Sequence, residues 1–157
     1  MKRKGTGYEI NPILTKFFND LVRLGLPELH TVPNFQYAVL FTEKETSDHY
    51  GGKTKRVEGS IRYKTGIDFM ILVLKPNYLG ASIEEKARIA LHELYHIESE
   101  NGKPKIRRHY DDFCELPAHD KFSRDLYERI RDRIKVPTNF GEYGGYEMKD
   151  GIRVYSV

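Results

Sequence analysis

Two histidines and a glutamate stand within five consecutive residues, His92-Glu93-Leu94-Tyr95-His96. On a helix, side chains four residues apart lie one above the other on the same face, so His92 and His96 can bind one metal ion. Imidazole nitrogens are common zinc ligands, and a carboxylate between them can accept a proton from a water molecule on the ion. If it is helical, the segment therefore predicts a Zn2+ site with His92 and His96 as ligands and Glu93 as catalytic base.

The surrounding sequence favours a helix. Ser82 and Glu85 form a capping box at its start, and Gly102 and Pro104 follow its end. The residues between them include apolar side chains at helical spacing: Ile83, Ala87, Ala90, Leu91, Leu94 and Ile97. At roughly 100° per residue these side chains share one stripe, and the two histidines lie on the opposite face. We expect one side of the helix to be buried in a core and the other to face a metal cleft.

A catalytic zinc site needs a third protein ligand, because three side chains hold the ion and the fourth position takes water. His119 directly follows a loop, at the start of a predicted helix from which it can face the metal helix. We therefore predict His119 as the third ligand. The alternatives are His109, within a basic segment, and a carboxylate from Asp112 or Glu115.

Four further residues have a possible role at such a site. Asp120 either accepts a proton from a ligand imidazole or acts only as an acidic residue at a helix N-terminus. Tyr110, Tyr63 or a histidine that is not a ligand can stabilise the oxyanion of a tetrahedral intermediate. Cys114 is the single cysteine, which we interpret as a buried thiol rather than a zinc ligand.

Two segments, His92-Glu93-Leu94-Tyr95-His96-Ile97 and Ala118-His119-Asp120-Lys121-Phe122, resemble the minimal zincin metallopeptidases, especially SprT-like domains and phage metallopeptidases. The resemblance covers roughly residues 67–134. It implies that His92 and His96 bind zinc, that Glu93 is the base and that His119 is the third ligand. The chain departs from the pattern in the length of the loop before His119, and the segment Arg107-Arg108-His109-Tyr110-Asp111 offers a competing match.

We interpret the chain as a zinc metallopeptidase that cleaves an extended or unfolded polypeptide. The SprT-like resemblance and the basic clusters raise a second hypothesis, a protease that acts on DNA-bound proteins. A third hypothesis, from a different class, is a non-catalytic binding module that contains zinc. Glu93 discriminates between catalysis and binding, because a structural zinc site has no need of that carboxylate.

The rest of the chain predicts a scaffold for the metal helix. Asn11-Pro12 begins a helix that ends near Gly25, and a second amphipathic helix runs from His119 to Pro137. Strands are expected at residues 36–42, 55–64, 67–74 and 103–110, and a terminal β-hairpin at 146–157. We expect strand 67–74 to be covered on both faces. The fold class is α+β and zincin-like, a small, mostly antiparallel sheet packed on the metal helix. Residues 1–157 form one domain, with a core at about 8–136 and a hairpin tail at about 139–157.

The composition of the chain limits the kinds of partner that we expect it to bind. The chain has 157 residues, 39% hydrophobic and 31% charged, with a formal net charge of +3. Its longest apolar run, residues 69–74, is far too short to span a bilayer, so we expect no membrane partner. A single cysteine excludes an internal disulfide framework and fits a cytoplasmic location. No pattern indicates an oligomeric state. Basic clusters allow weak nucleic-acid binding; they lie at residues 2–4, 53–56, 103–108 and 124–135.

Overall fold

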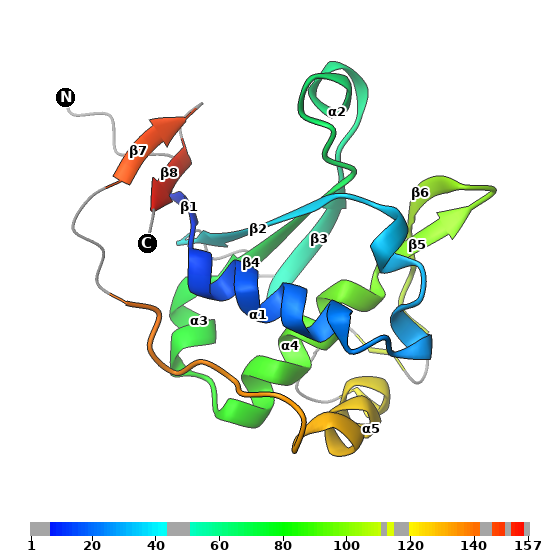
Figure 1. Cartoon of the computed structure of the whole chain (residues 1–157), viewed down its shortest axis with the longest axis vertical. Coiled ribbons are helices and arrows are strands. Elements are labelled where there is room, and N and C mark those ends of the chain that lie inside the picture. The colour runs from blue at the N-terminus through cyan, green and yellow to red at the C-terminus, as the bar shows by residue number, and fades with distance from the viewer. Residues whose placement is uncertain are drawn as a thin grey trace.

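A six-stranded mixed sheet forms the framework of the computed structural model (Figure 1). The structure describes residues 7–43, 51–110, 113–114, 120–141, 146–149 and 152–155. In their order across the sheet, the strands are β3 (Gly52–Arg56), β4 (Phe69–Leu74), β2 (Tyr37–Thr42), β1 (Tyr8–Ile10), β8 (Ile152–Tyr155) and β7 (Tyr146–Lys149). Neighbouring strands are antiparallel except in the β2–β4 and β1–β8 pairs. The predicted α+β class with a mostly antiparallel sheet is confirmed.

The first helix, α1 (Pro12–Arg23), begins where the sequence predicts. The Asn11 side chain accepts hydrogen bonds from the backbone N–H groups of Ile13 and Leu14 at 2.9 and 3.2 Å, which satisfies two amides that have no partner within the helix. One face of α1 is buried against the sheet and the other helices through Leu14, Phe17, Phe18 and Leu21. Two short 3-10 turns, Pro27–Leu29 and Val32–Asn34, then lead into β2.

The predicted metal helix is α4 (Ile83–Tyr95), and the Ser82 hydroxyl caps it by accepting the Glu85 N–H at 3.1 Å. One side of α4 packs in the core and the other side, with His92 and Glu93, faces a cavity as expected, but this second side is also almost fully buried. Every residue from Lys86 to Leu94 is buried, whereas Ile83 is 51% exposed. The reason is tertiary, because α4 contacts β3, α1 and α5 (Lys121–Ile130) and so has neighbours on most sides.

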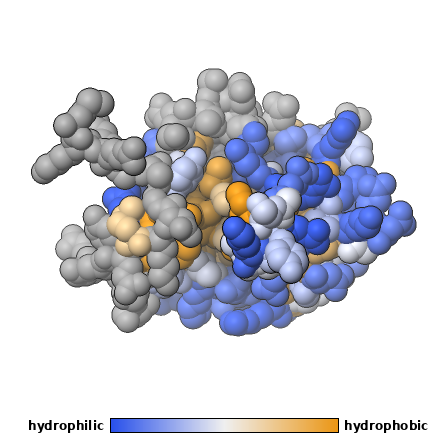
Figure 2. All heavy atoms as spheres, turned by 90° about the horizontal axis from the view of Figure 1, so that it is seen from above, coloured by the Kyte–Doolittle hydropathy of each residue, from blue (hydrophilic) through white to orange (hydrophobic). Residues whose placement is uncertain are grey.

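The predicted strand at residues 55–64 was wrong over most of its length. β3 ends at Arg56, and Gly59 then takes a left-handed conformation (φ +64°) and begins α2 (Gly59–Thr65). No residue of α2 is buried; Ile61 is 62% exposed and Tyr63 is 92% exposed. The alternating pattern misled because these apolar side chains lie on a helix that stands away from the sheet (Figure 1). Seen from that side, hydrophilic side chains cover most of the described surface (Figure 2).

β4 is an inner strand, next to the edge strand β3, and agrees closely with the predicted strand at 67–74. It pairs with β2 from Tyr37 opposite Phe69 to Thr42 opposite Leu74, and with β3 on its other edge. Phe69, Ile71 and Val73 are fully buried, but Met70 and Leu72 on the alternate face are only half-buried. Coverage is therefore complete on one face only. After β4 the chain forms α3 (Lys75–Gly80) before it enters α4.

The segment after α4 turns back as a hairpin of β5 (Ile97–Glu100) and β6 (Lys103–Ile106). Asn101 and Gly102 both have positive φ in the turn between them. The strand expected at 103–110 is thus confirmed for its first half. The terminal hairpin is confirmed as β7 and β8, and β8 adds in parallel to β1. No helix within the described residues is long and apolar enough to cross a membrane.

Candidate metal centre

Three histidine rings converge at the end of α4. His92 lies in its last turn, His96 is its C-cap residue, and His109 comes from the segment after β6. The Nε2 atom of His92 lies 3.2 Å from Nε2 of His109 and 3.3 Å from Nε2 of His96. One ligand atom from each of the three residues lies within 4.8 Å of the others. The fold therefore brings together two histidines that the HExxH spacing predicts and a third that is distant from them in sequence.

Hydrogen bonds at the opposite ring nitrogen orient two of these imidazoles. The Nδ1–H of His92 donates to Oδ2 of Asp120 at 2.7 Å, and the Nδ1–H of His96 donates to the Arg107 carbonyl at 2.7 Å. Burial, and then the proximity of His92, lowers the pKa of His96 to about 3, so that ring stays neutral. In a neutral imidazole whose Nδ1 carries the proton, Nε2 has only a lone pair. Lone pairs at 3.3 Å repel one another unless a cation lies between them.

The spacing of these nitrogen atoms fits a metal ion of the size of zinc. With zinc–nitrogen bonds of about 2.0–2.1 Å in tetrahedral geometry, two histidine ligand atoms lie about 3.3 Å apart. The two Nε2 separations at His92, 3.2 and 3.3 Å, agree with that value. His92 thus has the spacing of a zinc ligand pair with both His96 and His109, and the ligand atoms of all three histidines lie within 4.8 Å of one another.

Asp120 links the histidine cluster to the beginning of α5. Its carboxylate accepts the Ser123 N–H as the helix N-cap and also accepts the His92 Nδ1–H. Arg88 of α4 fixes the same turn, because it donates to the Asp120 carbonyl at 2.9 Å and to Ser123 Oγ at 3.2 Å. Sequence reasoning treated capping and support of a ligand as alternatives for Asp120. The structure shows that one carboxylate caps α5 and also accepts the hydrogen bond from His92.

Glu93 lies beside the histidines and is 2% exposed. The Thr54 hydroxyl, on β3, lies 2.7 Å from Oε2 of Glu93 and 3.0 Å from its carbonyl oxygen. Burial raises the pKa of Glu93, and the neighbouring His92 and the hydrogen bond from Thr54 oppose that rise. Sequence reasoning missed Thr54, because nothing in its local sequence marks a strand residue that contacts a helix far along the chain.

A cavity of about 230 Å³ opens beside these groups. Its lining comes from β3, from α4 with its C-cap residue, and from the segment 106–109. We call this cavity the metal cleft. Its lining residues are Gly52, Lys53, Thr54, His92, Glu93, His96, Ile106, Arg107, Arg108 and His109.

Phe113 packs against all three imidazoles and is 2% exposed. Its ring centroid lies 4.4 Å from that of His92, 4.8 Å from His96 and 4.9 Å from His109. Tyr95 also packs edge-on against Phe113, with 4.8 Å between the ring centroids. Phe113 therefore shields the histidine cluster on one side with apolar surface, a role that no sequence motif indicates.

The other residues singled out from the sequence lie in different places. His119, Asp112 and Glu115 lie outside the described residues, so of the candidates for a third ligand only His109 is placed. Tyr63 is on the exposed helix α2 and Tyr110 is 71% exposed, and neither lines the metal cleft. Cys114 is partly buried.

The mixed α+β fold and the histidine cluster together define a protein whose central helix is suited to hold a metal ion. A family model described as "Putative phage metallopeptidase" matches residues 6–136, and the chain belongs to that family. The resemblance to phage metallopeptidases is thus confirmed. No curated protein and no solved structure matches the chain. Membership indicates a peptidase with a polypeptide substrate, and the three close histidines indicate a metal ion.

Proposed function

We propose that the protein is a zinc-dependent, zincin-like metallopeptidase. The observation that carries this proposal is the convergence of three imidazole Nε2 atoms directly beside a buried glutamate. In the proposal His92, His96 and His109 hold the ion, and Glu93 is the general base. Family membership supports the peptidase activity, and the donor set supports zinc.

When bound, zinc lowers the pKa of a coordinated water toward about 7 and polarises a carbonyl oxygen. Glu93 accepts a proton from water during attack on the peptide carbonyl and delivers it to the leaving amine. Thr54 holds the Glu93 carboxylate by its hydrogen bond to Oε2. Asp120 and the Arg107 carbonyl keep the Nδ1 protons of His92 and His96, so that both Nε2 lone pairs stay directed at the ion.

The substrate in this proposal is an extended polypeptide. β3 is an edge strand of the sheet, and its residues Gly52, Lys53 and Thr54 line the metal cleft. An extended peptide can add to such an edge through backbone hydrogen bonds, which require few specific side chains. Unfolded proteins are therefore better substrates than folded ones.

Zinc content and activity test the proposal together. We expect about one zinc per wild-type chain by elemental analysis, and its loss in His92→Ala and His109→Ala. His119→Ala tests the other predicted third ligand; loss of zinc there but not in His109→Ala would assign the third position to His119. Glu93→Gln should keep zinc and the melting temperature but abolish cleavage of unfolded casein. A wild type that binds no zinc after reconstitution would overturn the proposal.

One observation favours a second candidate, a SprT-like protease that acts on DNA-bound proteins. Lys53, Arg107 and Arg108 line the metal cleft, and Lys53 and Arg108 have no ion pair with any described residue. DNA-stimulated cleavage with strong salt dependence would support this candidate. Unchanged cleavage in the presence of DNA would remove it. A zinc-containing binding module without activity predicts instead that Glu93→Gln changes nothing.

A further inference from the structure

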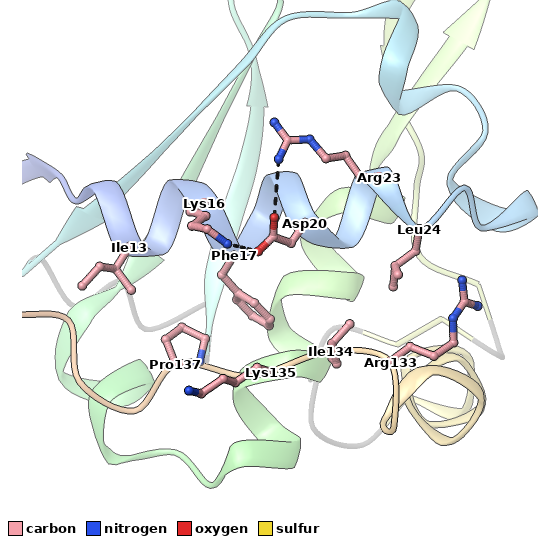
Figure 3. A pocket seen from close by; sticks show the side chains of 10 residues that line it. All are labelled: Ile13, Lys16, Phe17, Asp20, Arg23, Leu24, Arg133, Ile134, Lys135 and Pro137. Atoms are coloured by element: carbon pink, nitrogen blue, oxygen red, sulfur yellow. Dashed lines mark hydrogen bonds and ion pairs between the residues drawn. The ribbon is translucent and has the colours of Figure 1, made fainter.

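A second cavity, of about 400 Å³, lies between α1 and the segment that follows α5 (Figure 3). We call it the α1 pocket. It shares no lining residue with the metal cleft. Its lining residues are Ile13, Lys16, Phe17, Asp20, Arg23, Leu24, Arg133, Ile134, Lys135 and Pro137.

The inner part of the α1 pocket is apolar. Phe17 and Leu24 extend from α1 toward the segment 133–137, which contributes Ile134 and Pro137 (Figure 3). Phe17 is 3% exposed and belongs to the core, whereas Leu24 and Ile134 are only partly buried. The inner part of the pocket is therefore apolar, and its base is formed by a side chain of the core. It is large enough for one or two apolar side chains of a ligand.

The rim of the α1 pocket has an excess of positive charge. Four cations, Lys16, Arg23, Arg133 and Lys135, surround one carboxylate, Asp20. Asp20 already pairs with Lys16 at 2.7 Å and lies 3.5 Å from Arg23. Within the described part of the chain, Arg133 and Lys135 have no ion-pair partner. A ligand with carboxylates flanking an apolar group complements this distribution.

The backbone beside the α1 pocket indicates what kind of anion fits. Residues 134–136 belong to no helix or strand, and no described residue forms a hydrogen bond with the backbone of Ile134, Lys135 or Val136. Such N–H and C=O groups pair well with an extended peptide, whereas a fatty acid has no amide groups to offer them. A peptide ligand is therefore favoured by three features together: the positive rim, the apolar inner part of the pocket and the backbone groups of residues 134–136.

We propose that the α1 pocket binds a short acidic peptide segment of a partner protein, with an apolar side chain against Phe17 and Leu24 and carboxylates at Arg133 and Lys135. The site is separate from the proposed peptidase site and does not depend on the metal. It provides a docking position for an acidic partner on a surface away from the metal cleft.

The test is fluorescence polarisation with a labelled hexapeptide that has two central leucines between pairs of glutamates. We expect saturable binding to the full chain in roughly the micromolar range at low salt. Replacing the glutamates by glutamines, or the leucines by serines, should each weaken binding about tenfold or more, because each removes one half of the complementarity.

Charge reversal in the protein locates the site. Arg133→Glu combined with Lys135→Glu should weaken binding at least about tenfold. The matched control is Arg124→Glu with Arg131→Glu, which changes the net charge equally at exposed positions outside the α1 pocket. Asp20→Asn should strengthen binding, a gain that misfolding does not produce. Thermal melting checks that each variant is folded.

Several results would overturn the proposal. These are no saturable binding by the wild type, an equal loss in the control double variant, or equal binding of the serine peptide. An oligonucleotide of the same charge that competes as well as the peptide would show that the pocket recognises charge alone. Self-association that Arg133→Glu with Lys135→Glu removes, without any peptide binding, would assign the pocket to a second copy of the chain.

Discussion

Thr54 and Glu93 meet although they are far apart in sequence, on the edge strand β3 and on α4. Their hydrogen bond of 2.7 Å is buried and has no competition from bulk water. A carboxylate that must receive and return a proton benefits from a fixed position, because a misplacement of about 1 Å can cost about 100-fold in rate. At the scale of single residues, Thr54 is thus a positioning residue for the proposed base.

Thr54→Val keeps the shape of the side chain and removes its hydroxyl. We expect kcat on unfolded casein to fall about tenfold to 100-fold with little change in KM. The reason is that the substitution removes the hydrogen bond that positions the base and leaves the substrate-binding site intact. Thr15→Val is the matched control, since the Thr15 hydroxyl is buried and has no hydrogen-bond partner among the described residues. That change should leave activity intact. Equal kcat values for Thr54→Val and wild type would remove the role assigned to Thr54.

His96 makes the stability of the metal-free protein depend on pH. Its pKa falls from 6.5 to about 3 on folding, chiefly through burial, so between these values the unfolded chain binds more protons than the folded one. Stability contributed by neutral His96 is therefore complete above pH 6.5 and is lost as the pH falls toward 3. We expect the melting temperature of metal-free protein to drop across this window.

His96→Gln should flatten that pH dependence, and His30→Gln should not, because His30 is exposed. Calorimetry in the presence of a chelator measures both variants. A wild type and a His96→Gln variant with the same slope would contradict the assignment.

At the scale of elements, the metal centre depends on how α5 docks on α4. Asp120 caps α5 and supports His92, and Arg88 of α4 holds the turn in which Asp120 lies. A displacement of α5 would therefore remove the hydrogen bond that orients the His92 ring as well as the cap of the helix.

Asp120→Asn separates these two roles. Asparagine is a good N-cap, so the melting temperature of the metal-free protein should change little. The His92 Nδ1–H loses a charged acceptor, and loss of such a partner typically weakens metal binding about 10–100-fold. Competition with a chromophoric zinc chelator measures this affinity. Asp120→Ala, which removes the cap as well, should lower both stability and affinity; an unchanged affinity in both variants would contradict the role of Asp120.

Prediction from the sequence succeeded where local signals decide the structure. Asn11 and Ser82 mark helix starts by their own hydrogen bonds, and the HExxH spacing places two histidines together on any helix. Prediction failed where contacts between residues distant in sequence determine the structure. Nothing local shows that β3 ends at Arg56 and that Gly59 begins an exposed helix, or that His109 and Thr54 lie beside α4 in the metal cleft. The third ligand was open because chain distance carries no information about proximity in space.

At the scale of the whole molecule, the terminal hairpin is part of the main sheet. β8 pairs in parallel with β1, with Glu9 opposite Arg153 and Ile10 opposite Val154. Phe140, just before the hairpin, packs against Phe41 and Tyr78 in the core. We therefore propose that residues 1–157 form one domain, in which the hairpin is an integral layer rather than an appendage.

A variant that ends at Gly141 retains Phe140 and removes β7 and β8. Because β1 then loses one of its two neighbours, we expect a single thermal transition several degrees below that of the full chain. Zinc content should be unchanged, since no described residue that lines the metal cleft lies beyond His109 and every candidate ligand precedes Gly141. An unaltered melting temperature would show that the hairpin is independent of the domain, and scanning calorimetry decides between the two results.

The pairing of β1 with β8 also has a consequence for the order of events during synthesis. All side chains of the proposed metal centre lie between Thr54 and Asp120, so they are synthesised before residues 152–155. Until then one edge of β1 has no partner, and an open strand edge invites pairing with other chains. Zinc that binds the chain before β8 pairs would hold α4 to the segment after β6 and so shorten the period in which the open edge of β1 can pair with other chains.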